Sequence, residues 1–283
     1  MAVPRPVPAG PADGWGFETI PVGQGPHSVT VSRDGSRVYV TCARTGSVTA
    51  VEPTRRQVAA VHRVGASLYG VAVSPDGERL YTADPSRCAL SVVGAESGAV
   101  AAETVFEERP FGLAMAPNGA RLLVSAPREN AVLVTDGLGA PRGRLTGVDF
   151  AVGLALSPDG RLLYAANVFA GTVSVLDVSG LGSLAGSAAA VAAARIPVAR
   201  SPYGLALSPD GGRLYVAHFP FDLVSVVDTD ERAVAGTFAV PDGPRGVAVS
   251  PDGAKLYVAN GFASTVTVVE LWGRGDGGDR RLR

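Results

Sequence analysis

Apolar and polar residues alternate along the chain in one unit that occurs six times. Each unit has a short run of small and apolar residues, then Ser-Pro-Asp-Gly or a close variant, then a second apolar run that usually contains Tyr. The glycine of this turn stands at Gly35, Gly77, Gly119, Gly160, Gly211 and Gly253, in steps of 42, 42, 41, 51 and 42 residues. A repeat of about 40–45 residues with four short strands is typical of β-propeller blades.

The sixth unit shows how the strands follow one another. Residues 246–250 and 255–260 alternate with a period of two on either side of the turn, which predicts the first and second strands of a blade. Residues 264–271 are rich in β-branched side chains and predict the third strand. Fourth strands are expected at residues 57–64, 141–147 and 233–240 of other units.

The two ends of the chain complement each other. The last unit is followed by a polar tail in place of a fourth strand, whereas residues 17–23 look like a fourth strand with no blade before them. Pairing of residues 17–23 with residues 264–271 would close the ring and cover both edges. We therefore predict an all-β fold, a six-bladed propeller of four-stranded antiparallel blades over residues 17–272. Residues 1–16 are expected to be a flexible segment and residues 273–283 a polar C-terminal tail.

The words of the repeat resemble a known family. PHSVTVS, YGVAVSPDG, FGLAMAPNG and their copies, followed by RVYVTC, RLYTAD or KLYVAN, are similar to the YVTN type of β-propeller repeat. The resemblance covers about nine tenths of the chain and implies the propeller fold. Relatives with such repeats include lactonase-like enzymes, cofactor-linked dehydrogenase subunits, lyases and proteins with no assigned activity, so the resemblance leaves the function open.

Composition fits one compact domain. Of 283 residues, 46% are hydrophobic and 18% are charged, and the net charge is −1, which argues against a nucleic-acid surface. No apolar run reaches the roughly 20 residues of a membrane helix. The N-terminus lacks the apolar core of a signal peptide, so a cytoplasmic location is expected. Cys42 and Cys88 show no CxxC spacing and are expected to be free thiols.

One step of the repeat is longer than the others. The additional residues of the 51-residue step lie in the Ala-rich stretch 180–195. High alanine content favours a short helix there, before a fourth strand at residues 194–199. This insertion is a candidate for self-association.

Propeller sites usually lie where first strands enter and second strands leave, because both ends open on one face around the channel. The residue before the small residue of each first strand is His27, Tyr69, Phe111, Val152, Tyr203 or Arg245, in chain order. The second strands end at Cys42, Asp84, Ala126, Asn167, His218 and Asn260. The loops after the second strands add Phe169, Phe219, Phe221 and Phe262. A polar arc and an apolar arc around one channel are typical of a small-molecule site.

The chemistry of these residues suggests roles. His27 is the candidate base, because imidazole titrates near neutral pH. Arg245 is a candidate for holding a carboxylate or a developing oxyanion. Tyr69 and Tyr203 are expected to donate hydrogen bonds. Phe111 is expected to contact the apolar part of the ligand, as are Val152 and the four loop phenylalanines.

The second-strand endings divide into two groups. Asn167 and Asn260 match the repeat and are expected to bond loop backbone beside the ligand. Asp84 and His218 depart from the repeat and are candidate catalytic groups, and Cys42, which also departs, is a candidate ligand contact. Each of these residues has a structural alternative, because Tyr, His or Arg in the first ring and Asn in the second are common in such repeats.

No metal or cofactor is expected. Asp84, Asn167 and Asn260 offer one carboxylate and two amides, which make a weak cation site. His27, Cys42 and His218 lack the local spacing of zinc ligands. No nucleotide loop, serine nucleophile motif or haem-attachment motif is found in the sequence.

The sequence therefore favours a cofactor-independent enzyme of the hydrolase, lyase or cyclase type. It would bind a small, partly apolar organic molecule at one end of the channel and perform lactone opening, elimination or cyclisation by acid–base chemistry. The alternative is a non-catalytic scaffold that binds a protein partner through its aromatic loops. Neither nucleic acid nor a membrane is expected as a partner.

Overall fold

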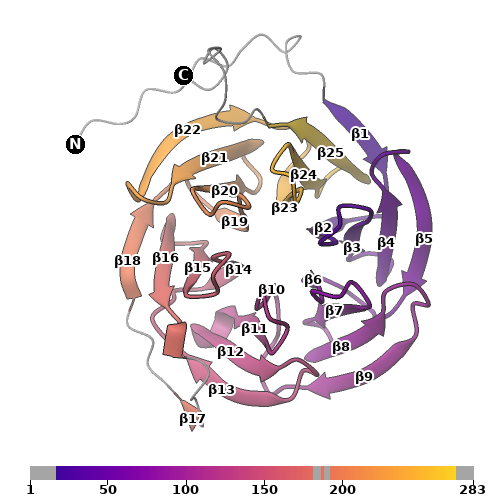
Figure 1. Cartoon of the computed structure of the whole chain (residues 1–283), viewed down its shortest axis with the longest axis horizontal. Coiled ribbons are helices and arrows are strands. Elements are labelled where there is room, and N and C mark those ends of the chain that lie inside the picture. Colours follow the sequence, from indigo (N-terminus) through magenta and orange to yellow (C-terminus); the bar gives the residue numbers. More distant parts are fainter. Residues whose placement is uncertain (1–16, 181–185, 188–191, 272–283) are drawn as a thin grey trace.

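The protein is a ring of six β-sheet blades around a central channel (Figure 1). The computed structural model describes residues 17–180, 186–187 and 192–271. Each blade begins at its innermost strand and proceeds outward through antiparallel strands, and its first three strands are neighbours both in sequence and in the sheet. The predicted six-bladed, all-β fold is confirmed.

The first three blades follow in chain order. Blade 1 contains β2 (Pro26–Val31), β3 (Val38–Cys42), β4 (Ser47–Glu52) and β5 (Gln57–Arg63). Blade 2 contains β6 (Val71–Val73), β7 (Arg79–Asp84), β8 (Ala89–Gly94) and β9 (Val100–Val105). Blade 3 contains β10 (Leu113–Met115), β11 (Arg121–Ala126), β12 (Ala131–Asp136) and β13 (Pro141–Leu145), with the 3₁₀ turn η1 (Pro127–Glu129) between β11 and β12.

The other three blades complete the ring. Blade 4 contains β14 (Ala151–Leu156), β15 (Leu162–Asn167), β16 (Thr172–Asp177) and β18 (Ala192–Pro197). Blade 5 contains β19 (Pro202–Leu207), β20 (Arg213–His218), β21 (Leu223–Asp228) and β22 (Ala233–Ala239). Blade 6 contains β23 (Pro244–Val249), β24 (Lys255–Asn260) and β25 (Thr265–Glu270), with β1 (Glu18–Pro21) as its outer strand.

Strand β1 closes the ring as predicted. It pairs antiparallel with β25, with Glu18 opposite Val268 and Pro21 opposite Thr265, and is shorter than the expected 17–23. Ile20 is only 2% exposed and belongs to a core cluster with residues of blades 1 and 6, including Val40 and Val266. The N-terminal strand therefore contributes apolar packing to the junction between the first and last blades as well as backbone hydrogen bonds.

The insertion differs from the sequence prediction. Gly186–Ser187 form a short strand, β17, that pairs in parallel with β13 as a fifth strand of blade 3. Residues 192–193, predicted as the end of a helix, belong to β18 together with the start of the predicted fourth strand, because β16 requires an outer partner and takes it there. The rest of the predicted helix, residues 181–185 and 188–191, lies outside the described residues. So do residues 1–16 and 273–283.

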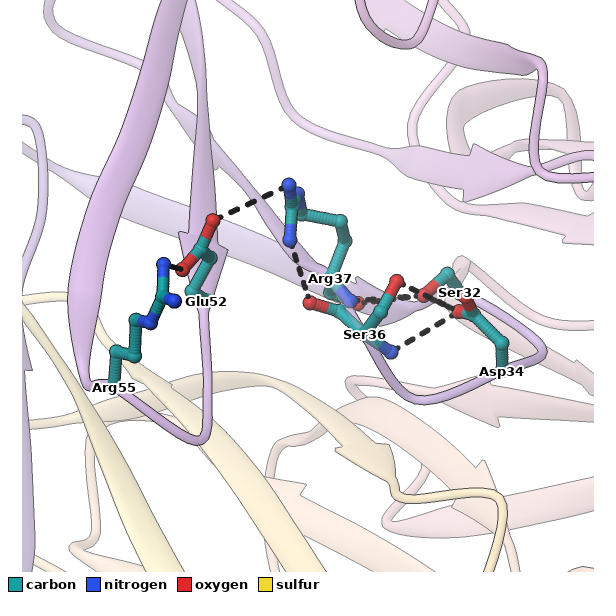
Figure 2. A network of polar contacts seen from close by, with 6 residues as sticks. All are labelled: Ser32, Asp34, Ser36, Arg37, Glu52 and Arg55. Carbon is teal, nitrogen blue, oxygen red and sulfur yellow. Dashed lines mark hydrogen bonds and ion pairs between the residues drawn. The ribbon is translucent and has the colours of Figure 1, made fainter.

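The Ser-Pro-Asp-Gly turns join first to second strands through the same contacts. In blade 1, where the turn reads Ser32-Arg-Asp-Gly, the Ser32 hydroxyl donates to Asp34 Oδ1 at 2.6 Å, and the Ser36 backbone N–H donates to the same oxygen at 3.0 Å (Figure 2). The Asp34 carboxylate thus supplies a hydrogen-bond acceptor for turn groups that have no backbone acceptor. The turn glycine has a positive φ, +74° at Gly35, which disfavours any other residue.

Most of the first-strand residues that line the channel are followed by a glycine, because adjacent blades approach each other closely at that point. A Cβ at Gly153 would lie 2.0 Å from the carbonyl oxygen of Tyr203, and one at Gly204 would lie 2.2 Å from that of Arg245. Adjacent first strands therefore touch through backbone atoms. This packing fixes the backbone positions of Tyr203 and Arg245, from which their side chains extend.

Cys42 and Cys88 are free thiols, and within the described residues no helix has the length and hydropathy to cross a bilayer.

Candidate ligand site at one end of the channel

Six side chains from six blades meet at the end of the channel where the first strands begin. Together they line one cavity of about 30 Å³, bounded by His27, Tyr69, Phe111, Val152, Tyr203 and Arg245 and by the small residues after them. We call these six residues the channel ring. Their convergence was predicted from the sequence, but the degree of closure was not. A cavity of this size has room for a water molecule or a single small polar group.

His27 occupies the centre of the polar half of the channel ring. It is 4% exposed, and its Nε2 lies 2.9 Å from the hydroxyl oxygen of Tyr203. Its ring stacks on that of Tyr69 with centroids 4.0 Å apart and contacts Tyr203 edge-on at 5.3 Å. Tyr69 in turn meets the edge of Phe111 at 5.1 Å. The aromatic contacts continue from blade 5 through blades 1 and 2 to blade 3.

Burial sets the protonation of this pair. Loss of hydration, with a further contribution from the nearby Arg245 cation, lowers the pKa of His27 to about 3, although a backbone hydrogen bond with Tyr69 acts in the opposite direction. Burial also raises the pKa of Tyr203 to about 12, against a smaller effect of Arg245. At neutral pH the imidazole is therefore uncharged and the phenol keeps its proton.

Arg245 is a cation without an anionic partner in the part of the chain that the structure describes. Its Cζ lies 4.3 Å from the centre of the Phe219 ring, a cation–π distance. Its Nε is buried without a hydrogen-bond partner, and no ion pair joins it to a described acidic residue. A half-buried guanidinium in this state has unused donors.

The loop phenylalanines extend the site outward on the same face. Phe219, in the loop between β20 and β21, lies 5.8 Å from Tyr203 and 5.1 Å from Phe262 between ring centres. Phe262 is 67% exposed, and Phe221 is 55% exposed. Phe169 is 78% exposed, and its ring pairs with that of Phe150 at 4.6 Å between ring centres rather than with Phe219 or Phe262. Phe150 was missed in the sequence, since it precedes β14 rather than following a second strand.

The second-strand endings lie beside the channel ring in the sheets but do not line its cavity. Blades 1, 4, 5 and 6 pair the start of the first strand with the end of the second, as in Pro26 opposite Cys42 and Pro202 opposite His218. Side chains at the second-strand ends point into the blade, where Cys42, Asp84, Ala126, Asn167, His218 and Asn260 are at most 1% exposed.

Asp84 holds the loop that leads into its own blade. Its Oδ2 accepts from the backbone N–H of Ala66 at 2.7 Å and of Ser67 at 3.1 Å, and its Oδ1 accepts from the N–H and hydroxyl of Ser86. Burial alone would raise its pKa, but these hydrogen bonds to the charged form outweigh burial and lower it.

The other endings make equivalent contacts with different atoms. His218 Nδ1 lies 3.0 Å from the Arg200 carbonyl oxygen and its Nε2 lies 2.8 Å from Ser225 Oγ, while burial lowers its pKa. The amides of Asn167 and Asn260 each donate to two hydroxyls of the third strand. Cys42 Sγ lies 3.5 Å from the Thr49 hydroxyl, and burial raises its pKa. These contacts anchor loops and third strands, and they give each of these second-strand endings a structural role.

The described residues contain no group of three or more His, Cys, Asp or Glu side chains arranged to hold a metal ion. The three residues weighed as zinc ligands have other contacts: His27 with Tyr203, Cys42 with Thr49, and His218 with Ser225.

Comparison with known proteins agrees with the fold. Residues 143–277 match the family model described as lactonase, 7-bladed beta-propeller, a segment that includes Tyr203 and Arg245. This match and the ring of six blades fit a lactonase-like propeller of the YVTN type. The blade number here is one fewer than in the family description. A comparison with curated proteins finds no sequence match.

Solved structures share the architecture. Hydrazine synthase of Kuenenia stuttgartiensis aligns with a TM-score of 0.67 and 21% identity, over 87% of this chain and 96% of that one. The β-propeller domain of Cps50 (Swd1) from Myceliophteria thermophila aligns with a TM-score of 0.71 and 12% identity, over 90% of this chain and 100% of that one. At these identities the likeness concerns the fold alone.

Proposed function

We propose that the protein binds a small organic anion with an apolar part at the channel ring, and that Arg245 pairs with its charged group. The observation that carries the proposal is the Arg245 guanidinium, which lies over Phe219 without an acidic partner among the described residues. A partly buried charge is costly unless it is paired. The planar fork of arginine suits a carboxylate, which it binds through two parallel hydrogen bonds.

The size of the cavity decides how the ligand would lie. About 30 Å³ between the ring residues admits only a small polar group, so the apolar part of the ligand stays outside. There the rings of Phe219 and Phe262, in contact with centres 5.1 Å apart, form an aromatic surface beside Arg245. A carboxylate attached to a flat or compact apolar group matches this arrangement of one cation and two aromatic rings.

Catalysis is the second step of the proposal. The match to the lactonase model favours lactone opening over elimination and cyclisation. In that reaction water adds to the ester carbonyl, the ring C–O bond breaks, and the product is a hydroxy carboxylate. Arg245 would stabilise the oxyanion and then the product charge. His27, uncharged at neutral pH, would accept the proton of the attacking water, and Tyr203 would give its proton to the leaving oxygen. The hydrogen bond between the two would return the proton from His27 to Tyr203. The proposal involves no metal and no cofactor.

Binding is tested with phenylacetate as the probe. Arg245→Gln should weaken binding at least tenfold in titration calorimetry, whereas Arg55→Gln, at a guanidinium with 74% exposed side chain on blade 1, should leave it unchanged. A bound carboxylate offsets the Arg245 charge, so the pKa of His27 should rise when phenylacetate is added, as observed by NMR of the imidazole. Equal affinity of wild type and Arg245→Gln would contradict the proposal.

Catalysis is tested separately with dihydrocoumarin, an aryl lactone. If the chemistry is as proposed, Tyr203→Phe and His27→Gln should lower kcat at least a hundredfold while phenylacetate still binds. Absence of turnover by the wild-type protein, together with phenylacetate binding, would reduce the function to that of a binding module.

A protein-binding scaffold is the second candidate, and one observation favours it. The channel ring is nearly filled, and the exposed rings of Phe169, Phe221 and Phe262 lie on the loops around it. A photo-cross-linking residue in place of Phe221 should then form a defined protein adduct in cells. The same residue in place of Val105, 68% exposed on an outer strand, is the control. Equal labelling at both positions would count against the scaffold.

A further inference from the structure

A larger cavity of about 480 Å³ occupies the channel on the other side of the ring residues. It runs along the first strands from the small residues behind the channel ring to the turns before the second strands, at Pro75, Pro117 and Pro158. Its volume lies within the range of small-molecule sites. This end of the channel is separate from the candidate site described above.

The wall near the turns is an apolar collar. One residue from each of five first strands contributes to it: Val31, Val73, Met115, Leu156 and Val249. All five are partly buried and pack against the core clusters of the blades, which leaves part of each side chain open to the channel. Arg33 is the one charged side chain among the residues that line this cavity.

Arg33 departs from the repeat at this position. The other five turns have proline between the small residue and Asp or Asn: Pro75, Pro117, Pro158, Pro209 and Pro251. The blade 1 turn keeps the hydrogen bonds of the others, with Ser32 and Ser36 bonded to Asp34 and the Arg37 N–H bonded to Ser32 Oγ at 2.9 Å (Figure 2). The fold therefore does not require an arginine at position 33.

The Arg33 side chain has no ion pair or hydrogen bond with another described residue, although acidic groups lie close by. It also lines a second hollow of about 460 Å³ between the turns of blades 1 and 2, which includes Asp34 and Asp76. The Asp34 carboxylate accepts from Ser32 and Ser36, and that of Asp76 pairs with Arg79 at 3.6 Å. Arg37, also in this hollow, pairs with Glu52 at 3.3 Å. Arg33 is thus the cation left for a ligand at the channel mouth.

We propose that this mouth of the channel is a second binding site, for an aliphatic carboxylate. The hydrocarbon chain lies within the apolar collar and the carboxylate pairs with Arg33 at the turns. A single exposed guanidinium contributes modestly, so the chain supplies most of the affinity. Burial of each methylene stabilises the complex enough to tighten binding about fourfold, until the collar is filled.

Met115 offers a reporter inside the collar. The chain has two methionines, and the other is Met1, so ¹³C-methyl labelling of methionine gives a Met115 signal that is easily assigned. Butanoate, hexanoate and octanoate are titrated in turn. We expect the Met115 signal to shift and the dissociation constant to fall by about fourfold for each added methylene.

Variants separate the charge from the collar. Arg33→Pro installs the residue that the other five turns have, so the fold should be retained, and Arg33→Gln is a second variant of the same site. Both should weaken octanoate binding about two- to fivefold, while Arg55→Gln should not. Arg245→Gln should also leave octanoate binding unchanged, because the two sites lie on opposite sides of the channel ring.

Three results would overturn the proposal. They are a Met115 signal that octanoate does not move, equal octanoate affinity in wild type and both Arg33 variants, and binding of 1-octanol as tight as that of octanoate. Loss of phenylacetate binding alone would concern the proposed function and not this site.

Discussion

His27 and Tyr203 form a hydrogen bond of 2.9 Å across the end of the channel, although 176 residues separate them in the chain. They belong to blades 1 and 5, so the bond spans the blade that the N-terminal strand closes. Because His27 also stacks on Tyr69 of blade 2, one imidazole links three blades. The protonation state of His27 therefore affects the stability of the ring as well as any chemistry at its centre.

The first prediction concerns pH and stability. His27 has a pKa of about 3 in the folded protein and about 6.5 when unfolded, so folding favours the neutral imidazole. Its contribution is fully present above pH 6.5 and is lost as the pH falls towards 3. Between pH 7 and pH 5 this amounts to about 2 kcal/mol of unfolding free energy. Urea unfolding of His27→Gln should show a decline smaller than that of wild type by about this amount. Parallel declines in the two proteins would contradict the assignment.

The second prediction concerns ring closure. Ile20→Ala removes most of a side chain that is 2% exposed between blades 6 and 1, and should destabilise the protein by about 2–5 kcal/mol. Glu18→Ala on the same strand removes an exposed ion pair with Arg56 and should cost less than about 1 kcal/mol. Thermal and urea unfolding measure both. If the two variants are equally stable, β1 does not contribute to the core as its burial indicates.

The blades and their closure could be predicted from the sequence because each blade is made of local hairpins. The turn words mark every first and second strand, and the period leaves one strand unpaired at each end of the chain. The site was predicted only in part. Spacing places His27, Tyr203 and Arg245 in one ring, but how far their side chains fill the channel depends on packing between blades distant in sequence.

Departures from the repeat proved ambiguous in the sequence. Asp84 and His218 differ from the usual Asn, but both are buried and bonded to backbone of the loop before their blade, a role that an alignment of repeats does not reveal. Arg33 is a departure of another kind, since its turn is complete without it. Hydrogen-bond partners distinguish the two cases, and these partners are visible only in three dimensions.

The third prediction concerns the contact between first strands. A Cβ at Gly153 would lie 2.0 Å from the Tyr203 carbonyl oxygen, so Gly153→Ala must push blades 4 and 5 apart. We expect a loss of roughly 1–3 kcal/mol or more, as for other overpacked sites. Gly236→Ala is the matched control, because a Cβ there meets no atom within 4 Å. Unfolding free energies of the two variants test this, and equal stability would show that the first strands have more room than their spacing indicates.

The last prediction separates Asp84 from His218, which the sequence places in one class. Asp84→Asn replaces an acceptor oxygen with an NH₂ group next to two sets of donors, the N–H groups of Ala66 and Ser67 and the groups of Ser86. At least one donor then loses its partner, with an expected cost of about 1–3 kcal/mol. His218→Asn installs the residue that Asn167 and Asn260 provide in blades 4 and 6, where its amide donates to the third strand. Its cost should stay within about 1–2 kcal/mol.

Acid sensitivity supplies an independent measurement. The pKa of Asp84 is lowered in the folded protein, so its stabilising contribution is fully present above the ordinary pKa of an aspartate and is lost as the pH falls from there through the lowered pKa. Asp84→Asn should therefore lose stability mainly at neutral pH, and the gap to wild type should narrow on acidification. A gap that stays constant with pH would mean that charge at position 84 does not hold the blade 2 loop. A larger loss in His218→Asn than in Asp84→Asn would contradict the distinction between the two residues.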